Sequence, residues 1–170
     1  MSVETILGLW KDVRAGLIQE VEKIPEDQFS FRATPETRSI AEILQHIIQA
    51  QKILVGETCR DETNLMRQSM LAHAQEYAPG VHKVTDKNGL LELLRSSMEE
   101  TQTCIAGSAD KLDATMTSLN GQATSKIAFL TFCVSHEMYH RGQLTVFERL
   151  LNIEPVLTGK VKKLFARASQ

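Results

Sequence analysis

The sequence of 170 residues contains little cysteine, proline and tryptophan, with three, four and one of each. The cysteines, Cys59, Cys104 and Cys133, include no Cys-x-x-Cys pair and are odd in number, which argues against a disulfide framework and against a cysteine zinc site. We therefore expect three reduced thiols. Cys133 falls in an apolar run and is expected to pack in the core.

Long apolar runs and an excess of one charge are also absent. No segment approaches the roughly 18–20 apolar residues that span a bilayer, and the start of the chain lacks the pattern of a signal peptide. Lys and Arg number 19 against 21 Asp and Glu, so the basic excess typical of nucleic-acid surfaces is missing. These absences predict a cytoplasmic protein that binds neither membranes nor nucleic acid.

The sequence does show helical periodicity: apolar residues recur at helical spacing along nearly the whole chain. Ser39 and Glu42 have the spacing of a capping box at a helix start. No strand is expected. The sequence predicts four long helices, over residues 3–24, 40–56, 87–106 and 123–152.

The segment 58–86 is more polar and contains Pro79-Gly80. It has room for one short helix, and its length permits a crossover along a bundle rather than a tight turn. We therefore predict an all-α four-helix bundle with a long crossover between helices 2 and 3. Residues 1–170 are expected to form a single domain, with a core over 3–155 and a short C-terminal tail over 156–170.

The most informative segment is the last predicted helix, which carries His136 and His140. At 100° per residue the two imidazoles lie about 40° apart, on the most apolar stripe of this helix. Such imidazoles lose their water and need partners for both ring nitrogens. A pair at i, i+4 can direct two nitrogens at one metal ion. Hydrogen-bonded core histidines are the alternative, but no carboxylate shares the stripe, so the pattern favours a metal.

A metal ion needs a third protein ligand, and His46 is the best candidate. It lies on the shoulder of the apolar face of the second helix, and its position alone leaves the assignment open. His73 and His82 belong to the polar crossover and are expected at the solvated surface. Three neutral histidines would leave a divalent ion an open coordination position, which suits a catalytic site.

Residues 136–140, HEMYH, also match the short HExxH pattern of zinc peptidases, in which the glutamate is the general base. Glu137 lies off the histidine stripe, where a solvated or salt-bridged side chain is the simpler interpretation. The third ligand of such peptidases lies downstream, but Glu148 is expected to point away from the histidines and Glu154 comes just before Pro155. The pattern therefore gives little support to a peptidase.

Three further residues follow the histidines on this helix. Gln143 shares their stripe one turn beyond His140, where it would position a substrate, orient a ligand or make a hydrogen bond inside the bundle. Gly142 costs about 1 kcal/mol relative to alanine, and marks either a close helix contact or a neutral substitution. Arg141 is expected at the surface or at a subunit boundary.

These residues resemble a known family. The segment HEMYHRGQLTVFERLLNIEP, residues 136–155, is similar to the last core helix of the DinB/YfiT-like family of metalloenzymes, which are bacterial four-helix bundles. The segment SIAEILQHI, residues 39–47, resembles the part of the family that contributes the first metal-ligand histidine. The resemblance covers most of residues 3–155. Carried over by position, it implies a metal triad of His46, His136 and His140.

The resemblance also implies a homodimer that binds one divalent ion, zinc or nickel first, with iron or manganese as alternatives. Some relatives use low-molecular-weight thiols in transferase or isomerase reactions, and others are described as hydrolases. We therefore predict a metal-dependent enzyme that activates a thiol or water to act on a small molecule, with Gln143 and Glu137 close to the metal or the substrate. The competing hypothesis is a non-catalytic, stress-related bundle whose metal only fixes the helices. An open cavity at the ion would favour the enzyme.

Overall fold

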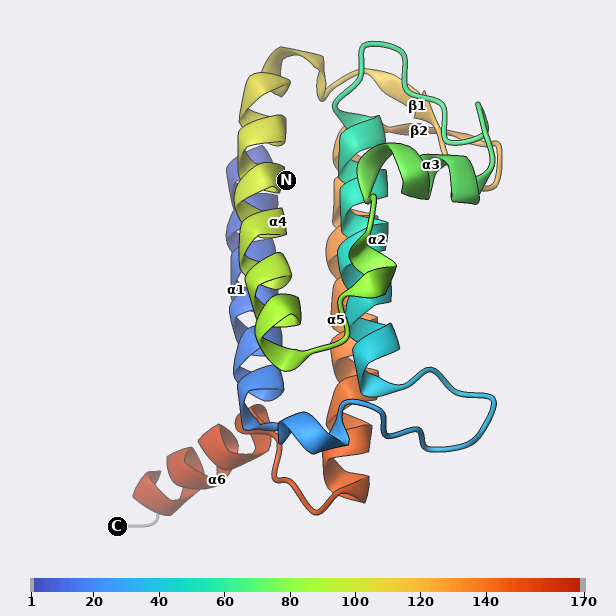
Figure 1. Ribbon diagram of the computed structural model, residues 1–170. Coiled ribbons are helices and arrows are strands. Elements are labelled where there is room, and N and C mark those ends of the chain that lie inside the picture. The colour runs from blue at the N-terminus through green and yellow to red at the C-terminus, as the bar shows by residue number, and fades with distance from the viewer. Residues whose placement is uncertain (1, 169–170) are drawn as a thin grey trace.

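A computed structural model describes residues 2–168, most of which are helical (Figure 1). Helices α1, α2, α4 and α5 form the predicted four-helix bundle. The elements are α1 (Val3–Lys23), α2 (Ile40–Thr58), α3 (Met70–Tyr77), α4 (Lys87–Gly107), β1 (Thr115–Thr117), β2 (Ala123–Ser125), α5 (Lys126–Leu150) and α6 (Val156–Ala168), with short 3-10 helices at Glu26–Gln28, Val81–Lys83 and Ala109–Lys111.

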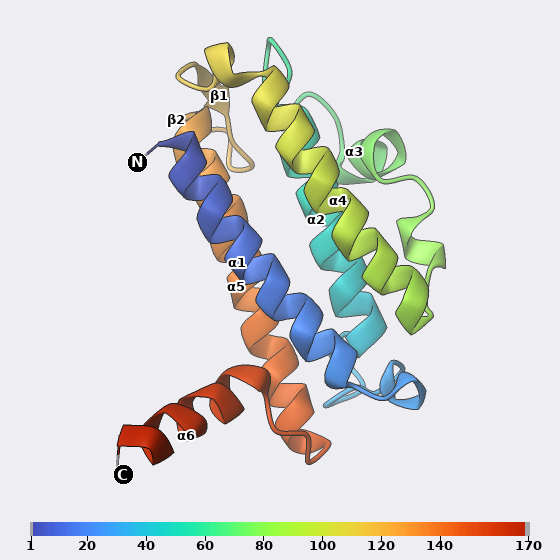
Figure 2. The same cartoon turned by 90° about the vertical axis from the view of Figure 1, so that its left-hand side faces the viewer.

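The helix directions explain why the chain needs a long crossover. The colours of Figure 1 show that α1 and α5 run one way along the bundle and that α2 and α4 run the other way. α2 contacts both α4 and α5, and α1 contacts the same two helices. Because α2 and α4 are parallel neighbours, the chain must travel back along the bundle between them. Residues 59–86 make this return on the outer side of α2, which confirms the predicted crossover (Figure 2).

Side-chain caps set the helix starts, as the sequence indicated for α2. Ser39 Oγ accepts a hydrogen bond from the Glu42 amide, and the Glu42 carboxylate accepts one from the Ser39 amide. The predicted start of the last helix at residue 123 is wrong, as is the expectation of no strand. Residues 123–125 pair antiparallel with residues 115–117 in a small hairpin, and α5 begins only after Ser125.

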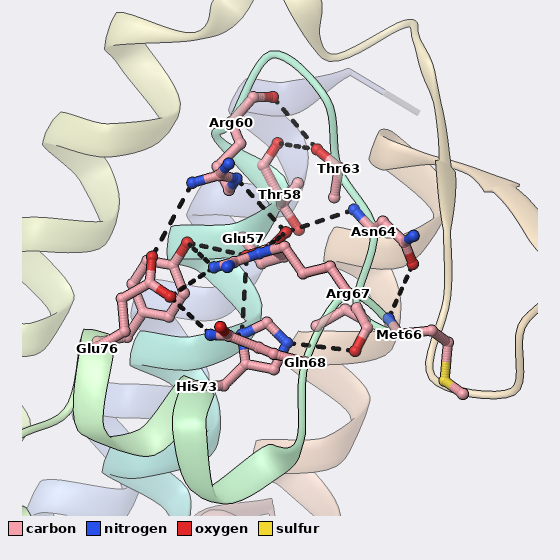
Figure 3. Close-up of polar contacts among 12 residues, drawn as sticks. Glu57, Thr58, Arg60, Thr63, Asn64, Met66, Arg67, Gln68, His73 and Glu76 are labelled. Carbon is pink, nitrogen blue, oxygen red and sulfur yellow. Dashed lines mark hydrogen bonds and ion pairs between the residues drawn. The ribbon is translucent and has the colours of Figure 1, made fainter.

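The crossover is held against α2 by the buried carboxylate of Glu57 (Figure 3). Arg67 Nε donates to both oxygens of Glu57 at 3.0 Å, and the Tyr77 hydroxyl donates to one of them at 2.9 Å. Burial by itself would raise the pKa of Glu57, but these hydrogen bonds stabilise the charged form, and the pKa falls below its ordinary value. The carboxylate therefore stays ionised and anchors the segment.

His73 is fully buried in the same cluster, so the expectation of a solvated side chain is wrong for this residue. Its Nδ1 lies 3.2 Å from Gln68 Nε2, and its Nε2 lies 3.2 Å from the Leu65 carbonyl oxygen. The crossover itself supplies both polar partners, which its polar composition does not reveal. His82 is exposed, as predicted.

The expectation of three reduced thiols is also wrong, because Cys59 and Cys104 form a disulfide. Cys59 follows α2 directly and Cys104 lies in the last turn of α4. These helices are parallel neighbours, so their ends meet, and the two Cα atoms are 6.2 Å apart, within the range of a disulfide. Cys133 is buried and free, as predicted, and burial raises the pKa of its thiol.

The core of the bundle consists of two apolar clusters, one around Trp10 and one around Leu44. Between the clusters each of the four long helices contributes a buried polar side chain. These residues are Arg14, Gln51, Ser97 and Glu137. Among residues 2–168, no helix is both long enough and apolar enough to cross a membrane.

The C-terminal tail forms a helix, α6, which extends away from the bundle (Figure 2). Its first amide, that of Val156, donates to Glu20 Oε2 at 2.6 Å. Glu20 is fully buried in α1 and lies against Glu148 of α5, which is fully buried as well. Neither carboxyl oxygen of Glu148 has a hydrogen-bond partner among the described residues. Burial, together with the neighbouring Glu20 carboxylate, raises the pKa of Glu148 to about 8.

A raised pKa in the folded state makes stability depend on pH. Glu148 is protonated when folded and ionised when unfolded between pH 4.5 and about 8, so its stabilising effect is lost as the pH rises through that window. We expect the free energy of unfolding to fall between pH 5 and pH 8 by on the order of 1–3 kcal/mol more in the wild type than in Glu148→Gln. Urea unfolding followed by circular dichroism measures this. The exposed Glu99→Gln should retain the wild-type slope, and equal slopes in all three proteins would contradict the expectation.

Candidate metal centre

Three histidines from two helices converge between α2 and α5: His46 from α2, and His136 and His140 from α5. One ring nitrogen of each lies within 4.8 Å of the ring nitrogens of the other two. The Nε2 atoms of His136 and His140 are 3.2 Å apart. Two nitrogen ligands of one tetrahedral ion lie about 3.3–3.4 Å apart, so the spacing of this pair fits a shared metal ion. The structure thus brings together the three histidines that the sequence singled out.

The histidines lie at the edge of the buried face of α5, and not at its centre as the apolar stripe predicted. Phe132 and Leu150, which belong to that stripe, are 44% and 55% exposed. Glu137, about 100° away around the helix, is buried instead. Phe129 and Phe147 of the same stripe are buried, so the buried face is rotated toward Glu137 and includes only one side of the stripe. The cluster of imidazoles therefore opens sideways to solvent.

The surroundings of the imidazoles keep them neutral. Burial is the largest cause that lowers the pKa of each of the three. For His46 the pKa falls to about 4, with further contributions from the positive charge of Arg38 and from the two neighbouring imidazoles. A neutral imidazole is the form that binds a metal ion. Each of the three rings therefore has one unprotonated nitrogen at neutral pH, which is the atom that binds a metal ion.

Gln143 orients one of the three rings. Its Oε1 lies 2.8 Å from His140 Nδ1 and accepts the hydrogen bond when that nitrogen carries the proton. This tautomer leaves His140 Nε2 with its lone pair, on the side that faces His136. Of the roles predicted for Gln143, the contact with His140 fits a residue that orients a ligand.

Glu137 lies about 100° around α5 from His136, in the polar layer of the core. Its Oε1 accepts from Arg14 Nε at 2.6 Å, and its Oε2 accepts from Trp10 Nε1 at 2.6 Å and from Arg14 Nη2 at 2.8 Å. Arg14 also donates to Gln51 Oε1 at 2.6 Å, and Ser97 Oγ donates to the same oxygen. The carboxylate is thus a buried ion-pair partner, in agreement with the salt-bridged alternative for this position.

Arg141 is less exposed than a surface residue, and Gly142 fits the neutral alternative of the two that the sequence left open. Arg141 is not at a free surface: its side chain is 20% exposed and donates to buried Glu20. It passes Gly16 of α1, where a Cβ atom would lie 2.2 Å from the guanidinium, so the guanidinium occupies space that Gly16 leaves free. Gly142 is exposed, and a Cβ added there would contact nothing within 4 Å, so it marks no close packing within the described chain.

Two cavities open beside the triad, and Arg38 lines both. The larger, of about 570 Å³, lies against Gln143 and the apolar side chains of Ile43, Val146 and Phe147. The smaller, of about 220 Å³, is lined by His46 itself. The sequence did not single out Arg38, because it lies in an irregular segment before α2 that matches no motif.

Comparison with known proteins identifies the family. Residues 1–166 match the profile of the DinB family. The chain belongs to the DinB family. This finding confirms the resemblance seen in the sequence, and it places both helices that carry the triad within the matched region. A search of curated proteins finds no match to this DinB-family chain.

Several solved structures share the fold. A DinB-like protein from Bacillus cereus has 16% identity and a TM-score of 0.70, with 91% of this chain and 95% of that chain covered. YfiT from Bacillus subtilis, described as a probable metal-dependent hydrolase with an unusual four-helix bundle topology, has 17% identity and a TM-score of 0.68, with 91% of each chain covered. The mycothiol-dependent maleylpyruvate isomerase has 15% identity and a TM-score of 0.69, with 85% of this chain but 61% of the isomerase covered.

The contacts of Glu137 generate a prediction about stability. Arg14→Ala leaves a buried carboxylate without its cation, and such a loss typically costs about 3–5 kcal/mol. We expect this decrease in the free energy of unfolding in urea. The matched control is Arg95→Ala, which removes an exposed ion pair with Glu22 and should cost less than about 1 kcal/mol. A similar cost for both variants would mean that the polar layer does not stabilise the bundle.

Proposed function

We propose that the protein is a metal-dependent enzyme in which His46, His136 and His140 hold one divalent ion and a small molecule reacts beside it. The observation that carries the proposal is the convergence of three neutral imidazoles next to two open cavities. When bound, a divalent ion with three nitrogen ligands keeps a free coordination position and lowers the pKa of a thiol or water placed there. Zinc and nickel suit imidazole ligands, and iron or manganese are alternatives.

The residues around the triad support this chemistry. Gln143 fixes the tautomer of His140 and at the same time lines the larger cavity. The apolar side chains of Val146 and Phe147 give that cavity a wall that excludes water from one side of a bound molecule. The names of two structural neighbours also agree, since one is described as a probable metal-dependent hydrolase and the other as a mycothiol-dependent isomerase. We propose a thiol-dependent transferase or a hydrolase on this basis.

The two alternatives are a purely structural metal site and a peptidase of the HExxH type, and the structure argues against each for a different reason. A purely structural metal would sit in a sealed site, but His46 and His136 are half-buried and the cavities are open, which favours the enzyme. In a peptidase of the HExxH type the glutamate must reach the attacking water. Glu137 instead accepts three hydrogen bonds in the core from Trp10 and Arg14, which argues against that role.

The test of the proposal is cobalt loading followed by addition of a thiol. We expect about one Co²⁺ per chain, and addition of 2-mercaptoethanol should produce a sulfur-to-metal charge-transfer band because one coordination position is free. The metal-free protein should stay folded, with a lower melting temperature, because the two apolar clusters form the core without the ion. Absorption spectroscopy and circular dichroism measure the two effects.

Controls separate the outcomes. His136→Ala should lose tight cobalt uptake, whereas His82→Ala, at an exposed histidine outside the triad, should retain it. Undiminished uptake by His136→Ala would eliminate the site. A cobalt spectrum that responds to no thiol or anion, or a metal-free protein that is unfolded, would instead support the structural role of the ion.

We also propose that the protein is a homodimer and that α6 contributes to the interface. Leu157, Val161 and Leu164 lie at helical spacing on α6 and are 40–66% exposed. A helix of 13 residues has little stability by itself in water. A second copy offers the same apolar face, and two-fold pairing would bury both faces at once. The cytoplasmic location expected from the sequence stays a prediction.

Light scattering tests this arrangement. The wild type should have about 38 kDa, which is twice the 19.0 kDa of one chain. Leu164→Glu should shift the protein toward the monomer, since a buried charge opposes the pairing of apolar faces. Met66→Glu is the matched control, because this exposed apolar side chain lies on the crossover and far along the chain from α6. A monomeric wild type would contradict the proposal.

A further inference from the structure

Arg38 is an exposed guanidinium that the structure leaves without a partner. Most arginines of the chain bind a carboxylate: Arg14, Arg32, Arg60, Arg67, Arg95 and Arg141 all do so. Within the part of the chain that the structure describes, Arg38 makes neither a hydrogen bond nor an ion pair. It follows that its five N–H donors are available to a ligand.

The position of Arg38 is next to the triad. It lies directly before Ser39, the cap of the helix that carries His46, and it shares one cavity with His46 and the other with Gln143. Its positive charge acts on all three histidines and, after burial, contributes to the lowering of the pKa of each imidazole. A molecule in the larger cavity would therefore contact Arg38 and Gln143, the residue whose side chain lies 2.8 Å from His140 Nδ1.

We propose that Arg38 is a specificity-determining residue that binds the carboxylate of a small organic acid, so that the substrate of this site is an anion with an apolar body. The proposal rests on the proposed function, since it names the substrate class of the same site. The planar guanidinium can hold a carboxylate through two parallel hydrogen bonds. Ile43, Val146 and Phe147 provide an apolar wall for the remainder of the molecule.

The other charges around the cavity are consistent with an anion. Glu36 is the only carboxylate that lines the larger cavity among the described residues, and it lies in the exposed segment before α2. Glu42, which lines the smaller cavity, is neutralised by an ion pair with Arg32. At about 570 Å³ the larger cavity has the size of typical small-molecule sites, which span roughly 300–1,000 Å³.

The experiment compares hexanoate with its uncharged analogue hexanamide on the cobalt-loaded protein. Calorimetry should show that the wild type binds hexanoate at least about tenfold more tightly than hexanamide, as expected for charge-assisted hydrogen bonds. Arg38→Gln should abolish that preference, and Arg38→Lys should keep part of it, because the charge remains and the paired hydrogen bonds are lost. Paramagnetic broadening of the hexanoate proton signals by bound cobalt should place the acid beside the metal.

The control is Arg95→Gln, which changes the net charge equally but removes an arginine paired with Glu22 on α1. It should leave both affinities unchanged. An undiminished preference for hexanoate in Arg38→Gln, or an equal loss in Arg95→Gln, would overturn the inference. Cobalt uptake is measured separately for every variant: uptake that fails in the wild type overturns the proposed function, whereas normal uptake with Arg38-independent binding overturns the role of Arg38 alone.

Discussion

The rotation of α5 about its own axis is fixed by a buried ion pair between Glu137 and Arg14 of α1. Two charges buried together are tolerated only if hydrogen bonds satisfy their remaining groups, and here Trp10, Gln51 and Ser97 supply them. Once Glu137 faces the core, the adjacent positions of the helix are determined. The histidines one residue before it and three residues after it must fall on the side of α5 that faces α2.

The second constraint is the position of His46 along the bundle axis, which depends on where α2 is attached to its neighbours. α2 begins at its capping box and carries Gln51 in the polar layer, five residues after His46. At its other end, the Glu57 cluster and the disulfide of Cys59 attach the crossover and α4. Because both ends of α2 are attached, His46 meets the two imidazoles of α5 at one level. The ion pair sets the direction of two ligands, and the helix ends set the position of the third.

Much of the fold and of the candidate metal site could be predicted from the sequence, and the features that could not be predicted share one cause. Periodicity predicted the four helices, and the length of the polar segment 58–86 predicted the crossover. The i, i+4 histidines together with the resemblance pointed to the three histidines that lie together. Hydrophobicity alone put the centre of the buried face of α5 on the histidine stripe. The centre lies nearer Glu137, because Arg14 stabilises that carboxylate from 123 positions away in the chain. The disulfide and the buried His73 depend in the same way on which segments become neighbours. Local sequence patterns do not show which distant segments become neighbours in the fold.

The exposed apolar side of α5 follows from the same arrangement. If the apolar stripe faced inward, Phe132 and Leu150 would be buried, but the imidazoles would then be enclosed with them and cut off from any substrate. The ion pair rotates α5 so that Phe132 and Leu150 are exposed while Phe129 and Phe147 stay buried. The imidazoles are thus buried enough to stay neutral and remain open to the cavities that Arg38 lines. Access for a ligand and exposure of apolar surface are thus two results of one rotation, and a variant that released Glu137 would be expected to change both together.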